Sequence, residues 1–197
     1  MNFTSPINQT GAVVRPFKLI LAIAVSSLLS VFALSVNAQT GNAPAYQLDA
    51  SIAEIMDSIV MPSADVLWNA VAIDVTTDGI KETKPTTDDD WDKLRWSAVA
   101  LAEATNLVII PNRRVAPAGT VSEAPGVELG PEQINTLIQG NRQAWVAHAL
   151  VLHTAAMEAI QMIDKRDVDG LSDVGGTIDA ACESCHLQFW YPDNPPQ

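Results

Sequence analysis

Cys182-Glu183-Ser184-Cys185-His186 lies near the C-terminal end of the 197-residue sequence and contains both of its cysteines. Residues three apart share one face of a helix, so the two thiols can reach the same edge of a flat macrocycle. C-x-x-C-H is the spacing of c-type haem attachment, in which the thiols bond to vinyl groups and the histidine binds iron. We therefore expect one covalent haem c, with thioethers at Cys182 and Cys185 and with His186 as the proximal iron ligand.

Three other roles can use two cysteines at this spacing. A redox-active dithiol usually follows a strand in a βαβ unit, and the residues before Cys182 do not alternate in hydropathy as a strand does. A structural zinc site needs four ligands, and the sequence has no second cysteine pair. The third alternative is a disulfide between Cys182 and Cys185 in an exported protein.

The motif lies on a regular apolar repeat. Its members are separated by three or four residues, which is the spacing of one helix face, and Asp167 can cap this helix. Both cysteines therefore lie on the face that the helix turns toward a core, where small residues leave room for a flat ring. The repeat consists of Val168, Leu171, Gly175, Ile178, Cys182, Cys185 and Phe189.

Three further segments have helical periodicity. The first is expected over about 48–73, with a kink or short break at Pro62, which lacks the N–H of a helical hydrogen bond. The second is expected over 88–110, opened by three aspartates that favour a helix N-terminus. The third is expected over 130–163.

With the last helix, these segments predict an all-α fold. Four amphipathic helices with short first and last connections favour an antiparallel up-down-up-down four-helix bundle, here with one covalently bound haem. We expect the bundle over 48–197, preceded by a flexible segment over 39–47.

The connection over 111–130 contains three prolines and three glycines and is expected to be a loop. Arg113 and Arg114 could contact haem propionates, although an adjacent basic pair in a loop is ordinarily solvated. His148, on the inner stripe of the third helix, could bind iron but is more commonly a hydrogen-bonded core residue.

Residues 1–38 have the layout of a secretory signal peptide. Arg15 and Lys18 precede an apolar run of 18 residues, and Val36-Asn37-Ala38 places small residues at the cleavage positions. We expect cleavage after Ala38, with an uncleaved membrane anchor as the alternative, and no later membrane span. Export fits a haem c protein, which in bacteria is completed in the periplasm.

The chain beyond the signal peptide is strongly acidic. Without Arg15 and Lys18, nine of the 11 basic residues remain against 23 acidic residues, a formal net charge of −14. Such a charge argues against nucleic acid and anionic membranes as partners. It favours partner proteins with basic docking surfaces, although an acidic exterior also serves solubility alone.

The sequence resembles the cytochrome c′ class of four-helix-bundle c-type cytochromes. The resemblance covers roughly residues 48–191. It rests on a single C-x-x-C-H near the end of the last helix, on Asp167-Val168-Asp169-Gly170-Leu171 before it, and on Ile55-Met56 in the first helix. It implies that the first helix faces the other side of the iron, and it leaves room for a homodimer.

A distal ligand on the first helix would be Met56 or Met61. Met56 shares a helix face with Ile52 and Ile59. Met61 lies about 140° around the helix from Met56 and directly precedes Pro62, which disfavours the α-helical conformation at Met61. We therefore expect Met56 to be the distal iron ligand, with core filling as the alternative role.

The expected function is electron transfer. A Met/His pair keeps iron low-spin and raises its potential, so we expect a periplasmic cytochrome that passes single electrons between redox partner proteins and is not an enzyme. The alternative is a five-coordinate, gas-binding cytochrome c′ that is open to NO or CO. A non-haem protein with a disulfide is the third hypothesis.

Overall fold

Helices make up most of residues 46–192, the part of the chain that the computed structural model describes. The folded unit begins at Gln47. The signal peptide expected over 1–38 and nearly all of the segment expected to be flexible, 39–47, lie outside the described residues. The expectation of a mainly helical fold is confirmed, with one exception in a short β-hairpin.

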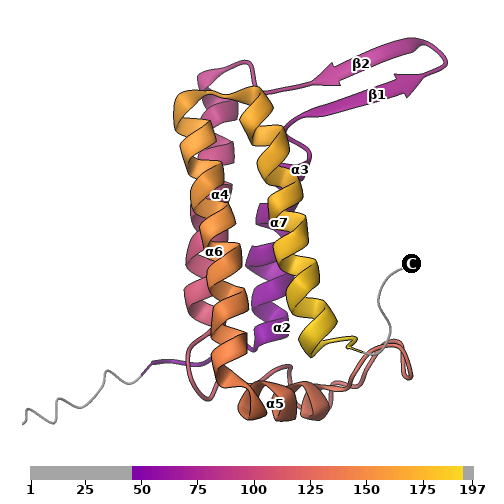
Figure 1. Ribbon diagram of the computed structural model, residues 1–197, viewed down its shortest axis with the longest axis vertical. Helices are drawn as coiled ribbons and strands as arrows, with labels where there is room; N and C mark the ends of the chain where they lie inside the picture. The colour runs from indigo at the N-terminus through magenta and orange to yellow at the C-terminus, as the bar shows by residue number, and fades with distance from the viewer. Residues whose placement is uncertain (1–45, 193–197) are drawn as a thin grey trace, which may run out of the picture. The chain divides into compact units, whose positions relative to one another are not determined.

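Four long helical stretches run side by side (Figure 1), and each packs against two of the others. The first helix packs on α4, α4 on α6, α6 on α7, and α7 on the last segment of the first helix. The first helix consists of three consecutive segments, α2 (Ile52–Ile55), η2 (Met56–Val60) and α3 (Met61–Trp68). The other members are α4 (Asp88–Val108), α6 (Arg142–Lys165) and α7 (Val168–Phe189).

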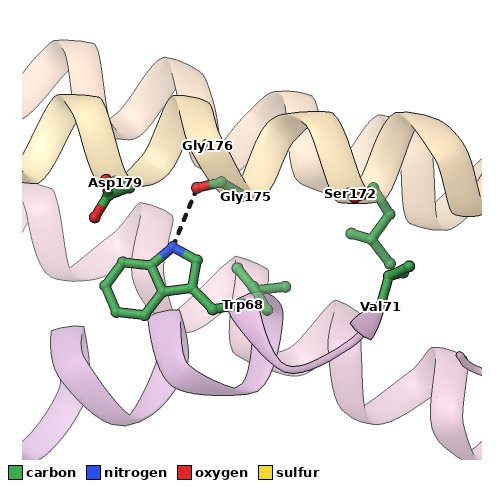
Figure 2. A pocket seen from close by; sticks show the side chains of 8 residues that line it. Trp68, Val71, Ser172, Gly175, Gly176 and Asp179 are labelled. Carbon is green, nitrogen blue, oxygen red and sulfur yellow. Dashed lines mark hydrogen bonds between the residues drawn. The ribbon is translucent and has the colours of Figure 1, made fainter. Parts of the chain in front are cut away.

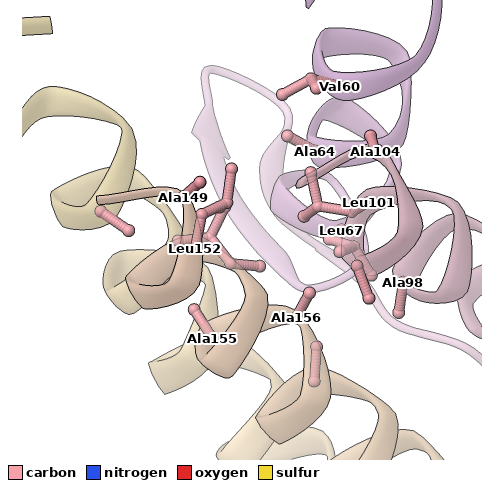
Figure 3. Close-up of a cluster of buried hydrophobic side chains, with 14 of the residues drawn as sticks. Val60, Ala64, Leu67, Ala98, Leu101, Ala104, Ala149, Leu152, Ala155 and Ala156 are labelled. Carbon is pink, nitrogen blue, oxygen red and sulfur yellow. The ribbon is translucent and has the colours of Figure 1, made fainter. Parts of the chain in front are cut away.

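Alanine fills much of the core where the first helix, α4 and α6 meet (Figure 3). Ala64, Ala98 and Ala156 are each 0% exposed, and small side chains on facing helices allow the backbones to approach closely. The residues that share one face of α4 are buried in this core. They are Trp91, Leu94, Ala98, Leu101, Thr105 and Val108.

The first helix is shorter than predicted and is not broken at Pro62. It begins at Ile52 after a capping box in which Ser51 accepts from the Glu54 N–H and Glu54 accepts from the Ser51 N–H. It ends at Trp68. The chain accommodates Pro62 through the π-helical turn η2 immediately before it, so the expected kink takes the form of a widened turn.

The β-hairpin corrects the all-α expectation. Strands β1 (Ala72–Thr76) and β2 (Gly79–Thr83) pair antiparallel, with Val75 opposite Ile80. The two-residue loop is Thr77-Asp78, and Gly79, which pairs with Thr76, adopts a φ of 125°, which favours glycine. Among the described elements, β1 and β2 pack only on each other, so this hairpin extends from the end of the bundle (Figure 1).

The three aspartates lie in the first turn of α4, as predicted, and the residue before them is the N-cap. Thr87 is the N-cap, with its side chain accepting from the Asp90 N–H at 3.2 Å. Asp90 returns the contact by accepting from the Thr87 N–H at 2.9 Å. The other two aspartates lie in the first turn, where carboxylates suit the helix dipole.

The segment expected as one helix over 130–163 forms two. α5 (Pro131–Gly140) ends one residue before α6 begins, because Asn141 leaves the helical conformation with φ −140° and ψ 56°. The Asn141 side chain then caps α6 by accepting from the Ala144 N–H at 3.3 Å. A glycine followed by asparagine is a common helix boundary.

By length and composition, α6 could cross a membrane, contrary to the expectation that no later segment could. A core helix passes the same test, and α6 packs on both α4 and α7. This property is therefore weak evidence for a membrane span.

Candidate functional site

The motif predicted to attach haem lies in the last two turns of α7. Asp167 caps this helix by accepting from the Gly170 N–H at 3.0 Å, as expected. Cys182, Cys185 and His186 are all half-buried, and the two cysteines pack against the hydrophobic core. Both cysteines are free thiols. The local helix therefore gathers the two sulfur atoms and the imidazole on one side of α7.

The two thiols are poor candidates for redox catalysis. Burial, followed by the charge of Asp179, raises the pKa of Cys182 to about 11. Burial, followed by the neighbouring Cys182, raises the pKa of Cys185 to about 12. Reactive dithiols have a lowered pKa and often lie at helix N-termini, whereas this pair lies near a C-terminus, where the dipole disfavours a thiolate.

His186 is suited to be a neutral metal ligand. Burial lowers its pKa, and the nearby charge of Glu183 opposes this effect only in part. The ring of Trp190 stands perpendicular to the imidazole, with the centroids 4.9 Å apart, and the ring of Tyr191 lies at 5.9 Å. The backbone N–H groups of Trp190 and Tyr191 both donate to the His186 carbonyl, at 2.8 and 3.0 Å. These contacts hold the end of α7 around the imidazole.

Glu183, inside the motif, forms a polar contact beside His186. The Tyr191 hydroxyl donates to Glu183 Oε2 at 2.7 Å, whereas Glu183 Oε1 is buried and has no hydrogen-bond partner among residues 46–192. Burial, followed by this hydrogen bond and the carboxylate charge, raises the pKa of Tyr191 to about 12. An unpaired acceptor calls for a donor such as water. Haem propionates are themselves acceptors and could not donate to Glu183 Oε1, so this unpaired oxygen does not indicate a haem.

Met56 lies at the start of η2, half-buried and packed against the core. Met61, the other methionine of the first helix, is 49% exposed. Met56 is therefore the more buried of the two, as its position on the helix face predicts. Whether Met56 binds iron stays a prediction.

The first helix and α7 run in opposite directions, which allows Met56 to be placed along the bundle axis (Figure 1). Trp68 Nε1 donates to the Gly175 carbonyl at 3.1 Å, so these two residues are level. Met56 lies twelve residues before Trp68, about 18 Å at the helical rise. The same length along α7 from Gly175 leads to Leu187, next to His186. The structure therefore brings Met56 and His186 to the same level of the bundle.

At this level the first helix stands away from α7. The α3 segment packs on α7, but no Cα atom of α2 or η2 lies within 8 Å of a Cα atom of α7. Helices in direct contact have axes about 8 to 10 Å apart. A flat group with an axial ligand on either side needs a wider separation, so the spacing and the donor set fit a haem between Met56 and His186.

A cavity lies between α3 and the part of α7 that precedes the motif (Figure 2). Its volume is about 290 Å³. Gly175 lies against the indole of Trp68, where a Cβ atom would be 3.7 Å from Trp68 Cδ1, an ordinary van der Waals contact. The lining residues are Leu67, Trp68, Val71, Leu171, Ser172, Gly175, Gly176 and Asp179.

Arg113 and Arg114 donate to backbone carbonyls, and a contact of either side chain with haem propionates stays a prediction. Arg113 is 8% exposed and donates to the carbonyls of Leu107 and Ala50. Arg114 donates to the Asp49 carbonyl at 2.6 Å. Both guanidinium groups therefore tie the 111–130 loop to the start of the first helix.

His148 contacts α7 through both ring nitrogens. Its Nε2 lies 2.6 Å from Gln188 Oε1, and its Nδ1 lies 3.3 Å from Ser184 Oγ. This is the hydrogen-bonded arrangement that the sequence favoured over iron binding. Within residues 46–192, no group of three or more His, Cys, Asp or Glu side chains could hold a metal ion.

No protein-family model, curated protein or solved structure matches the chain.

Proposed function

We propose that the protein is an exported c-type cytochrome with one covalent haem, and that its helices form an antiparallel four-helix bundle of the cytochrome c′ kind. The observation that carries this proposal is the placement of the motif. Cys182, Cys185 and His186 share the half-buried end of α7, level with a segment of the first helix that stands away from it.

The chain's own residues would bind and orient the group. Cys182 and Cys185 would anchor it by thioethers, and the hydrophobic core behind them would exclude water from one face. His186, kept neutral by burial and held by the contacts of Trp190 and Tyr191, would be the proximal ligand. Met56 would offer a soft thioether on the other side. A bound haem would supply the ferric/ferrous couple.

We propose single-electron transfer between redox partner proteins as the function, without an enzymatic step. The formal net charge of −14 beyond residue 38 favours partners with basic docking surfaces and disfavours nucleic acid. Association of two copies is compatible with this function.

A second candidate is a gas-binding cytochrome with five-coordinate iron. The observation in its favour is that Met56 packs against the core, as a core-filling methionine would. If the Met56 side chain stays in the core and does not bind iron, the side opposite His186 is open to NO or CO.

Absorption spectra of the purified protein separate the hypotheses. Low-spin spectra in both oxidation states, with no change when CO is added to the reduced protein, support electron transfer. A high-spin spectrum with CO binding supports the gas-binding alternative. A colourless protein would contradict both and leave the disulfide hypothesis.

Export is the remaining part of the proposal. We expect cleavage after Ala38, so that N-terminal sequencing of periplasmic protein begins at Gln39. Recovery only from washed membranes, with residues 1–38 intact, would instead indicate a membrane-anchored cytochrome.

A further inference from the structure

The inward-facing residues of the first helix recur at intervals of four. They form two parallel rows, and every member is buried or half-buried. Such a repeat has a longer period than the 3.6 residues of an α-helix. The rows are Ile52, Met56, Val60 and Ala64, and Ile55, Ile59, Ser63 and Leu67.

A continuous α-helix could not bury both ends of these rows. At about 100° per residue, Ile55 and Ala64 would point about 180° apart, because they are nine residues apart. Their exposed fractions are 2% and 0%. Met56 would likewise point about 80° away from Ala64.

The π turn supplies the missing rotation. In η2 the Met61 N–H donates to the Met56 carbonyl, five residues back instead of four. One extra residue in a turn rotates the preceding segment by about 100° relative to the following one. This rotation brings Ile52, Ile55 and Met56 back onto the face that α3 buries.

Pro62 explains why the extra residue lies at this position. It has no N–H to donate to the Ser58 carbonyl, and its ring crowds that carbonyl in a regular helix. The Ser58 hydroxyl donates to the Glu54 carbonyl, a contact that also tends to bend helices. The widened turn and the proline therefore favour each other.

We infer that the π turn at Met56–Val60 is a one-residue phase correction that turns Met56 toward the face bearing Ala64 and holds it level with His186. The exposed residue Ser58 is then the surplus residue of the turn, and Pro62 is a positioning residue. Iron binding by Met56 rests on the proposed function. The claim that the π turn aligns Met56 with the core does not depend on it.

Deletion of Ser58 tests this inference, with deletion of Asp65 as the matched control. Both residues are exposed and belong to the same helix, but Asp65 lies in the regular α3 segment. Loss of Ser58 should convert the π turn into an α turn and leave Ile55 and Met56 in place. Loss of Asp65 should rotate α2 and η2 by about 100° relative to the end of α3.

We expect the Ser58 deletion to unfold thermally within a few degrees of the wild type. The Asp65 deletion should lose about 10 °C or more, or fail to fold, because buried apolar residues turn outward. In the holoprotein, the Ser58 deletion should keep low-spin iron and the wild-type reduction potential.

Two results would overturn the inference. A Ser58 deletion as unstable as the Asp65 deletion would show that the turn contains no surplus residue. A stable Ser58 deletion that has changed from low-spin to high-spin iron would show that removal of one residue from the turn does not keep the direction of Met56, contrary to the phase correction. A high-spin wild type with a stable Ser58 deletion would instead refute the iron ligand proposed above while supporting the phase correction.

Discussion

The indole N–H of Trp68 donates to the carbonyl oxygen of Gly175 at 3.1 Å, joining the last residue of the first helix to the middle of α7 (Figure 2). The indole also lies against Gly175, where a Cβ atom would be 3.7 Å from Trp68 Cδ1. The contact fixes the relative height of two antiparallel helices and thereby the level at which Met56 faces α7.

Trp68→Phe should destabilise the bundle. Phenylalanine removes the hydrogen-bond donor but keeps an aromatic ring, so we expect a loss of about 1 kcal/mol in the free energy of unfolding. Trp96→Phe is the control, because Trp96 is 66% exposed. Denaturant titrations of the two variants measure the difference, and equal stabilities would mean that the Trp68 hydrogen bond contributes nothing.

Arg113→Ala should be far more damaging than Arg114→Ala. Truncation of Arg113 leaves the carbonyls of Leu107 and Ala50 without this donor in a buried setting, which costs about 1 to 3 kcal/mol. The side chain of Arg114 is 52% exposed, and its ion pair with Glu54 is an exposed one of small effect. Thermal unfolding of both variants distinguishes them, and the reverse order would contradict this role of Arg113.

Asp90 should make stability depend on pH in the acid range. The backbone N–H groups of Thr87 and then Thr86 lower its pKa from 3.8 to about 2. A carboxyl group with a lowered pKa stabilises the fold above its unfolded pKa, and this contribution is lost as the pH falls from about 4 to about 2. Asp90→Asn should therefore be less stable than the wild type at pH 7, with the difference vanishing near pH 2.

The control for Asp90 is Asp92→Asn, an exposed position on the same helix. Its unfolding midpoint should differ little from that of the wild type at either pH. If Asp90→Asn retained wild-type stability at pH 7, the capping role of the carboxylate would be wrong.

Local and regular patterns made much of the fold predictable. α7 and α4 follow repeats of three and four residues, and the two cysteines and His186 lie within five consecutive residues. Their placement on one half-buried face needs only helical geometry. No local pattern predicts the hairpin strongly, because its strands are almost entirely exposed and its turn signal, Asp78-Gly79, lies in a polar stretch between two helices.

The remaining differences arise where the helical period changes. A repeat of exact fours from Ile52 to Ala64 signals a widened turn, but a search for a period of 3.6 does not recognise it. Gly140-Asn141 likewise signals a helix boundary inside a continuous apolar pattern. The level of Met56 relative to His186 depends on a contact between Trp68 and Gly175, 107 residues apart in sequence, which no local pattern reveals.

Met56→Ala should convert the iron from low-spin to high-spin and allow CO to bind to the reduced protein. Removal of the thioether leaves the position opposite His186 open. Met61→Ala, at the exposed methionine of the same helix, should leave both properties unchanged. An unchanged spectrum in Met56→Ala would show that Met56 only fills the core.

Covalent attachment of haem at Cys182 and Cys185 is the central claim, and intact mass spectrometry of the exported protein after acid–organic extraction tests it most directly. The account predicts the mass of the polypeptide from Gln39 onward plus one haem, and the polypeptide mass alone for the double variant Cys182→Ala/Cys185→Ala. A wild-type protein that releases its pigment into the organic phase, or that has the mass of the polypeptide alone, would contradict it.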